Sequence, residues 1–264
     1  MNPTPPSSAP ATPTAPRPVR RRVTAAAAAA LSVTAACGLF FSSGTTPPAV
    51  QGPQATTGLP APTVDMAIVR DSEDAGRTVN LTLDDGPDPR WTPLALDLLK
   101  KHGAKAVFCV TGPNAAAHPD LVRRIVAEGH RLCDHSVSHD TAMDHRPVAY
   151  QEKEILGAKR MIDHASGGAR LWYYRAPGGA FTPESRRIAA AHGMRSLGWN
   201  VDPGDYRQPG ADVIVRAVKN QLSKGLTVLL HDGGGHRAQT MSALEELLPW
   251  FTAQGYTFSF PQGG

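Results

Sequence analysis

From residue 78 onward, short runs of β-forming residues alternate with longer amphipathic runs of helical periodicity. The β-forming runs are TVNLTL, KAVFCV, HRLC, LWYY, RSLGWNV, LTVLL and YTFSF. The helical runs cover 93–102, 114–128, 148–165, 183–192, 211–223 and 240–253. This alternation predicts a mostly parallel sheet with helices packed outside it. Seven strands favour an α/β fold of the distorted (β/α)7 barrel type, and an open doubly wound sheet is the alternative.

The first 75 residues have a different character. Arg20, Arg21 and Arg22 precede a mostly apolar stretch at 25–41, the order of a secretory signal peptide or a short membrane anchor. The segment that follows resembles a flexible tether. We therefore expect a signal peptide or membrane anchor region at 1–41, a flexible linker at 42–75 and one folded domain at 76–261.

This N-terminus predicts a protein that is secreted or tethered to the cell surface. Cleavage after Ala36 suits the small residue Thr34, whereas a lipoprotein signal ahead of Cys37 usually carries an apolar residue at that position. Outside the cell, Cys109 and Cys133 are free to form a disulfide. Two separate buried thiols are the alternative, since free cysteine packs well in protein cores.

The net charge of +4 is a weak indication of a polyanionic partner. Much of the basic excess lies in Arg17 and Arg20 to Arg22, where targeting explains it. The chain has no zinc-ribbon spacing, no basic stripe with interleaved aromatics and no RNA-binding motif. We therefore expect no nucleic-acid partner.

Polar residues follow five of the expected strands. They form the segments DDGP at 84–87, DHSVSH at 134–139, RAPGG at 175–179, DPGDY at 202–206 and HDGGG at 231–235. The carboxyl ends of parallel strands share one rim, where functional groups of α/β proteins gather. The sequence therefore predicts one site that combines aspartates, histidines and an arginine.

His135 and His139 are four residues apart, so one helical turn would place both imidazoles on the same side. Two histidines and a carboxylate form a three-ligand metal set that leaves coordination positions open. Of the adjacent Asp84 and Asp85, one can bind the cation while the other stays free as a base. A surface turn is the alternative for DDGP, and an exposed helix pair is the alternative for the histidines.

The remaining rim residues suit acid and base chemistry. Arg175 can pair with the free aspartate and keep it ionised, unless it is a surface arginine. His231 can be a general acid for a leaving nitrogen or oxygen, unless it is a core histidine bonded to backbone. Asp202 or Asp205 can hydrogen-bond that imidazole and raise its pKa. Trp199 is close enough to the rim to line a pocket.

With these residues assembled, the chain resembles the polysaccharide deacetylases, the NodB-homology domain of carbohydrate esterase family four, over about residues 76 to 261. LTLDDGP, HSVSH, RAPGG, DPGDY and LLH match the five family motifs in order. The resemblance implies a distorted (β/α)7 barrel. It implies Asp84 as the base and Asp85, His135 and His139 as the metal ligands.

The last three motifs imply further roles. By the same resemblance, Arg175 is the partner of the base, Asp205 tunes the acid and His231 is that acid. Pro177, Tyr206 and Leu229 are implied to shape the substrate groove, the aromatic wall and the acetyl pocket. Leu83, Gly178 and Tyr206 depart from the commoner family residues, and the last two put substrate specificity in doubt while leaving the reaction intact.

The resemblance implies a metal-dependent hydrolase that removes N-acetyl groups from peptidoglycan or chitin-type oligosaccharides. A divalent metal is implied, Zn²⁺ with Co²⁺ as the alternative, and an acetylated glycan is the partner. The alternatives are an O-acetyl xylan esterase and a non-catalytic glycan-binding domain. A metal phosphoesterase would need a second cation or more basic groups than the sequence places on the rim. We expect a secreted or surface-tethered monomer that meets a membrane only through an uncleaved anchor.

Overall fold

A computed structural model describes residues 58–263, so the predicted signal or anchor region and much of the predicted linker lie outside the described residues. The sheet has the strand order β1-β6-β5-β4-β3-β2-β7, and neighbouring strands are parallel. The strands are β1 (Ile68–Val69), β2 (Thr78–Asp84), β3 (Ala106–Val110), β4 (Arg131–Asp134), β5 (Leu171–Tyr174), β6 (Arg195–Leu197) and β7 (Thr227–His231). A short β8 (Thr257–Phe258) pairs with β2 outside this order.

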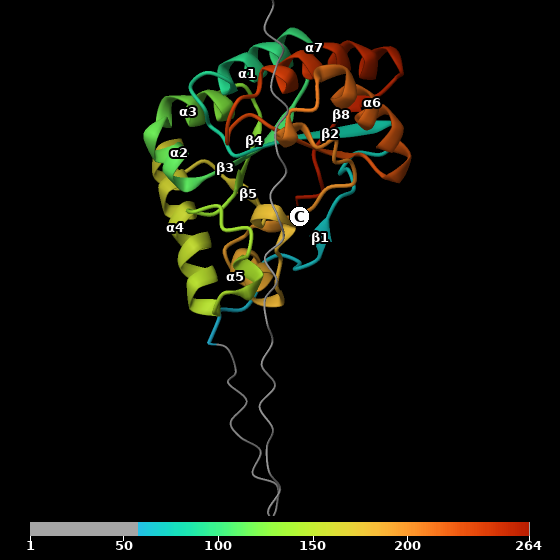
Figure 1. Cartoon of the computed structure of the whole chain (residues 1–264). Coiled ribbons are helices and arrows are strands. Elements are labelled where there is room, and N and C mark those ends of the chain that lie inside the picture. Colours follow the sequence, from blue (N-terminus) through green and yellow to red (C-terminus); the bar gives the residue numbers. More distant parts are fainter. Residues whose placement is uncertain (1–57, 264) are drawn as a thin grey trace, which may run out of the picture. The chain divides into compact units, whose positions relative to one another are not determined.

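The sheet curls toward closure between its two edge strands (Figure 1). Val201, four residues beyond β6, forms a bridge with Val228 of β7. Thr227 on β7 donates its hydroxyl to the carbonyl of Arg70, the residue after β1, at 2.5 Å. The architecture is the distorted (β/α)7 barrel that the sequence predicts, and the open doubly wound alternative is wrong.

Helices pack around the outside of the curled sheet (Figure 1). They are α1 (Thr92–Lys101), α2 (Gly112–Ala117), α3 (Pro119–Ala127), α4 (Val148–Ser166), α5 (Pro183–Ala191), α6 (Ala211–Gln221) and α7 (Ala238–Ala253). Short 3-10 turns lie at Met143–His145, Pro177–Gly179, Asp205–Arg207 and Leu222–Lys224. None of the helices in residues 58–263 has both the length and the apolar character to cross a membrane.

Three sequence-based elements differ from the structure. The single helix predicted at 114–128 is two helices, because Pro119 cannot continue a helix from His118 and instead begins a new one. The run RSLGWNV forms a strand only over Arg195–Leu197, after which the chain leaves the sheet and returns at Val201. β1, which precedes the predicted domain start at residue 76, pairs with β6.

The side-chain alternation of each strand separates two layers of the interior. Val79, Leu81 and Leu83 of β2 point outward into the core beneath the helices. Asn80, Thr82 and Asp84 alternate with them and therefore point into the barrel. The same period on β7 turns Leu229 and His231 inward. Because Asp84 lies beside His231 in the β2–β7 register, the two side chains face the same interior.

The barrel interior also holds a disulfide between Cys109 of β3 and Cys133 of β4, which are direct register partners. Both cysteines belong to a small inner cluster with Val69, Val107, Tyr173 and Leu197. The sequence did not decide between this bridge and two separate thiols. The bridge joins β3 to β4, the strand that leads to His135 and His139.

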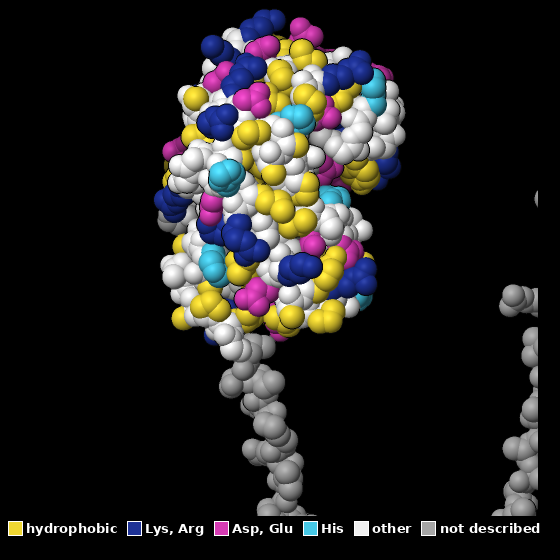
Figure 2. All heavy atoms as spheres, turned by 90° about the vertical axis from the view of Figure 1, so that its left-hand side faces the viewer, with side chains coloured by type: hydrophobic (Ala, Val, Ile, Leu, Met, Phe, Trp, Pro, Cys, Tyr) yellow, Lys and Arg dark blue, Asp and Glu magenta, His cyan; other side chains and the backbone are white. Residues whose placement is uncertain are grey.

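The described residues carry no net basic excess. All of Arg17, Arg20, Arg21 and Arg22 precede them, and the first acidic residue of the chain is Asp65. On the face shown in Figure 2, Lys and Arg side chains are interspersed with Asp and Glu. This face offers no continuous basic surface to a polyanion.

Candidate active site

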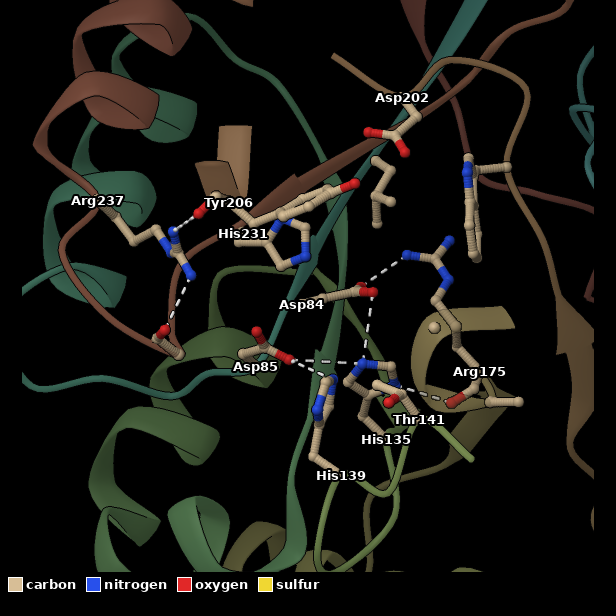
Figure 3. A pocket seen from close by; sticks show the side chains of 15 residues that line it. Asp84, Asp85, His135, His139, Thr141, Arg175, Asp202, Tyr206, His231 and Arg237 are labelled. Atoms are coloured by element: carbon tan, nitrogen blue, oxygen red, sulfur yellow. Dashed lines mark hydrogen bonds and ion pairs between the residues drawn. The ribbon is translucent and has the colours of Figure 1, made fainter. Parts of the chain in front are cut away.

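A pocket of about 460 Å³ opens at the carboxyl ends of the strands. Nine of the eleven predicted site residues line it, namely Asp84, Asp85, His135, His139, Arg175, Trp199, Tyr206, Leu229 and His231. The other two, Asp205 and Pro177, are buried behind or beside the lining residues. Segments that are far apart in the sequence thus meet at one rim (Figure 3).

Asp84 ends β2 and is held by a buried arginine. Nη1 of Arg175 donates to Oδ1 of Asp84 at 2.6 Å and to the hydroxyl of Thr82 at 2.8 Å. The rest of the guanidinium donates to the carbonyls of Leu197 and Gly198, so every side of it has an acceptor. Arg175 is fully buried, and a charge so placed needs this pairing. The pair orients Asp84 with its other oxygen, Oδ2, toward His135 (Figure 3).

Asp85, His135 and His139 form a compact group of three possible metal ligands. One donor atom from each lies within 4.8 Å of the other two. Oδ1 of Asp85 is 3.1 Å from Nε2 of His139 and 3.5 Å from Nε2 of His135. This oxygen is buried, yet it receives no well-formed hydrogen bond from the described residues. An orphaned carboxylate oxygen facing two imidazoles fits a bound divalent cation.

The ring of His135 is oriented by its second nitrogen. Nδ1 contacts the carbonyl oxygen of Arg175 at 2.8 Å, so it carries the proton and leaves the lone pair on Nε2. Metal-ligating histidines commonly have such a backbone partner, which sets the tautomer and the ring direction. The same segment, RAPGG, therefore serves both Asp84 and His135.

The loop that carries both histidines is not the helical turn that the four-residue spacing predicts. Residues 135–140 have no helical structure, and Ser136 and His139 adopt left-handed backbone conformations with φ of 65° and 53°. The two imidazole rings meet edge to face with their centroids 4.9 Å apart. A folded loop, rather than a helix face, brings the ligands together.

The pKa shifts of Asp85 and His135 suit a cation, whereas that of His139 opposes one. Burial alone would raise the pKa of Asp85, but the contact with His139 and the nearby histidine charges hold this pKa well below its ordinary range. Burial holds the pKa of His135 below its ordinary value, although Asp84 and Asp85 oppose that effect. The close contact with the Asp85 carboxylate raises the pKa of His139, so a metal ion must displace a proton there.

His231, on the strand next to Asp84, is held by Asp205. Its Nδ1 lies 2.7 Å from Oδ1 of Asp205, and its backbone N–H donates to Oδ2 at 2.9 Å. The hydroxyl of Thr240 also donates to Oδ2. Burial by itself would lower the pKa of His231, but the bond and the charge of Asp205 raise it, helped by Asp84 and Asp85. His231 therefore holds a proton above its ordinary pKa and points Nε2 into the pocket.

The two aspartates of DPGDY have different positions. Asp205 is fully buried beneath His231, whereas Asp202 lines the pocket and accepts the backbone N–H of Gly204 at 2.8 Å. The position of the two aspartates in the sequence left open which of them bonds to the imidazole, whereas the family resemblance implied Asp205. In the structure the bond is made by Asp205.

The pocket walls are largely aromatic and apolar. The ring of Tyr206, which is 41% exposed, stands edge to face against His231 with centroids 5.4 Å apart. Trp199 lines the wall nearest Arg175, whose guanidinium lies 5.5 Å from its ring. Pro177 is buried and does not line the pocket; its neighbours Ala176 and Gly178 do.

A glycine-rich loop after β7 closes against Asp85. A Cβ at Gly233 would collide with the carbonyl of Asp85, and one at Gly234 would collide with the Asp85 carboxylate. Arg237 secures this loop, because its guanidinium donates to the carbonyls of Gly233 at 2.6 Å and Gly234 at 3.0 Å. The glycines thus allow the loop to lie directly beside Asp85.

Some residues of the site escaped sequence reasoning. Thr82 is two positions before Asp84, and strand periodicity could have placed it on the same face. Thr240 and Thr141 offer no such pattern, since each reaches the site from a helix start or a loop.

The rim of this parallel α/β barrel thus gathers an Asp-His-His group, an aspartate paired with a buried arginine and a histidine bonded to a buried aspartate. A polysaccharide deacetylase profile matches residues 71–197. The chain is 37% identical over 198 residues to a chitooligosaccharide deacetylase of Sinorhizobium fredii, covering 70% of this chain and 91% of that protein. It is 35% identical over 184 residues to a peptidoglycan-N-acetylglucosamine deacetylase of Bacillus cereus, covering 69% and 85%.

A solved structure agrees with these relatives. The family 4 carbohydrate esterase from Streptomyces lividans, in complex with acetate, superposes with a TM-score of 0.63 and 29% identity, covering 70% of this chain and 93% of that one. The chain therefore belongs to the polysaccharide deacetylase family, the NodB-homology domain of carbohydrate esterase family 4.

Proposed function

We propose that this protein is a metal-dependent hydrolase that removes N-acetyl groups from N-acetylglucosamine-containing polysaccharide, of the peptidoglycan or chitin type. The observation that carries this proposal is that the candidate base, the candidate acid and the three candidate metal ligands lie together at the rim. Asp84 and His231 are register neighbours on β2 and β7, and the Asp85, His135 and His139 group lies beside them. The names of the two relatives, both deacetylases of such glycans, support the substrate class.

The metal ligands in this proposal are Asp85, His135 and His139, and the cation is Zn²⁺, with Co²⁺ as a substitute. Imidazole nitrogens together with a carboxylate are a donor set that zinc accepts. A cation there would supply Lewis acidity and lower the pKa of a water molecule that it binds.

The protein's own groups would move the protons. Asp84, held by Arg175, accepts a proton from the attacking water and so completes its activation. His231, kept protonated by Asp205, donates its Nε2 proton to the departing amine nitrogen. The proton acceptor and the proton donor thus each have one buried partner at hydrogen-bond distance.

The substrate would lie across the aromatic residues of the rim. Leu229 is 5% exposed at the floor of the pocket and suits an acetyl methyl group. Tyr206 and Trp199 give flat surfaces on which sugar rings can pack. Gly178 adds no side chain to this wall, so we propose an open groove that accepts a polymer.

The cellular setting is part of the same proposal. We propose export by the segment at 1–41, a tether that begins at 42 and ends before β1, and catalysis by the folded domain outside the cell, acting as a monomer. A disulfide between Cys109 and Cys133 is compatible with an oxidising compartment.

Acetate release from N-acetylglucosamine oligomers tests the function. The full chain is stripped of metal and assayed before and after addition of zinc or cobalt. Metal-restored acetate is the expected result. Release from O-acetylated xylan alone would instead favour the esterase, and zinc binding without any release would favour a glycan-binding domain.

Asp84→Asn separates the base from the metal site. The variant should lose turnover while it still binds zinc, because Asp84 is proposed as the base and Asp85 as the ligand. Turnover equal to that of the unmodified chain would show that Asp84 is not the base.

A further inference from the structure

The loop that carries His135 and His139 rests on a buried carboxylate from α4. Oε2 of Glu154 accepts the backbone N–H of Ser138 at 2.7 Å and that of Val137 at 3.2 Å. It also accepts the hydroxyl of Ser138 at 2.9 Å. Glu154 is only 6% exposed, and the hydrogen bonds that the described residues give its side chain all come from this loop.

The loop needs such a partner because its backbone is unusual. Ser136 and His139 both have positive φ, a conformation that residues other than glycine seldom adopt without support. The ends of the loop are secured elsewhere, since Ser136 N–H donates to Asp134 and His139 N–H donates to the Ser136 hydroxyl. The two amides between these anchors, those of Val137 and Ser138, are the ones that Glu154 accepts.

The contacting face of α4 is fitted to the loop over two turns. Tyr150 brings its hydroxyl to 3.3 Å from the Ser138 hydroxyl, one turn before Glu154. Gly157 is almost one turn after Glu154, and a Cβ there would come to 3.0 Å from a methyl group of Val137. A carboxylate with three donors and a glycine at the closest approach indicate that α4 is a support for this loop.

We propose that Glu154 is a positioning residue that holds His139 at the distance from His135 and Asp85 that a metal ion requires. The inference rests on the metal site of the proposed function. His135 has its own anchor in the Arg175 carbonyl. The His139 side chain is 38% exposed and depends on the course of the loop.

The effect of losing Glu154 follows from this arrangement. Removing a group that orients metal ligands typically costs 10–100-fold in metal affinity. Asp84 and His231 stand on β2 and β7, away from α4, so the base and the acid keep their places. Zinc affinity should therefore fall by about 10–100-fold, while kcat at saturating zinc changes much less.

The test compares Glu154→Ala with Glu152→Ala in the full chain. Glu152 is on the same helix and is only half-buried, so its removal makes the same change of charge without touching the loop. Zinc affinity is measured by competition with a chromophoric chelator. Glu154→Ala should lose affinity and Glu152→Ala should not, and Glu154→Gln, which keeps one acceptor oxygen, should fall between them.

Hydrogen exchange of the metal-free proteins gives a second readout that needs neither zinc nor activity. Glu154→Ala should speed exchange at the amides of Val137 and Ser138, while the central strand β3 keeps its protection. Unchanged zinc affinity or unchanged exchange at these amides would overturn the proposal. If the unmodified chain bound no zinc, the proposed function would fail, and the exchange rates would still decide the role of Glu154. Should Glu154→Ala not fold, Glu154→Gln carries both measurements.

Discussion

Replacement of Asp205 by Asn tests whether a buried carboxylate keeps His231 protonated for catalysis. In the structure Asp205 accepts Nδ1–H of His231 at 2.7 Å, and its second oxygen accepts two further donors. An asparagine can keep an oxygen toward Nδ1 only by turning its NH₂ group toward the backbone N–H of His231. Whichever way its amide group turns, asparagine has no negative charge to place beside the imidazolium of His231.

The size of the effect follows from the lost charge-assisted bond. A hydrogen bond to a charged group contributes about 1.5–3 kcal/mol. At about 1.36 kcal/mol per pKa unit, the pKa of His231 should fall by roughly 1–2 units. Because the acid must be protonated, activity falls as pH rises through this pKa. The alkaline limb of the kcat/KM profile should therefore move to lower pH by the same amount, with about 10–100-fold less activity above it.

The pH profile of acetate release, measured at saturating zinc, is the assay. The substitution leaves the contact between Asp84 and Arg175 untouched. Thr240→Val is the matched control. It removes one donor to Asp205 but keeps the charge, so the alkaline limb should not move downward. An unmoved alkaline limb in Asp205→Asn would refute the reasoning, as would an equal downward shift in Thr240→Val.

Three further outcomes follow from contacts around the site. The Cys109→Ala, Cys133→Ala double variant should lose about 3 kcal/mol of unfolding free energy, because the disulfide no longer restricts the unfolded chain by closing a loop between residues 24 apart. Reductant should lower the denaturant midpoint of the unmodified chain but not that of the double variant. Gly234→Ala should weaken zinc binding about tenfold or more by pushing Asp85 aside. Gly235→Ala, also at a positive φ (138° against 68° at Gly234) but without contact with Asp85, should retain zinc affinity. Burial raises the pKa of Asp232 to about 7 from its ordinary 3.8, helped by the charges of Asp85 and Asp84. The metal-free chain should thus lose stability as pH rises through that window. Asp232→Asn should make this loss smaller when denaturant midpoints are compared at about pH 5 and about pH 8, and the raised pKa values of His139 and His231 should account for the loss that stays.

The sequence predicted most of the strands because a short run of β-forming residues is a local property. In TVNLTLD the apolar residues Val79, Leu81 and Leu83 mark the outer face, so Asp84 had to face inward. The boundaries failed where a single residue interrupts a pattern, as Pro119 does in the predicted helix at 114–128. Partners that converge from distant segments, such as Thr240 on Asp205, leave no local pattern to detect.

The histidine loop shows a different limit. Spacing alone suggested a helical turn for His135 and His139, and it could not reveal the left-handed backbone at Ser136 and His139. A trace of the support was nevertheless present in α4. Glu154 lies among Gln151, Ile155 and Ala158 on the buried side of that helix, where an acidic residue needs a nearby donor. A charged residue at a buried helical position could have indicated that this helix faces a polar loop.

The two halves of the site have different structural origins, and this difference governs how each should respond to change. Asp84 and His231 are placed by the register of two adjacent strands, which is maintained by the whole sheet. The ligand group depends on Asp85 beyond the strand end, on a loop with two left-handed residues and on contacts from Glu154 and Gly234. Perturbing these supports should lower metal affinity with little effect on the acid and base. Perturbing Asp205 or Arg175 should change proton transfer while the ligands stay in place. A variant of Asp205 that lost zinc affinity as strongly as a variant of Glu154 would show that the two halves are not independent.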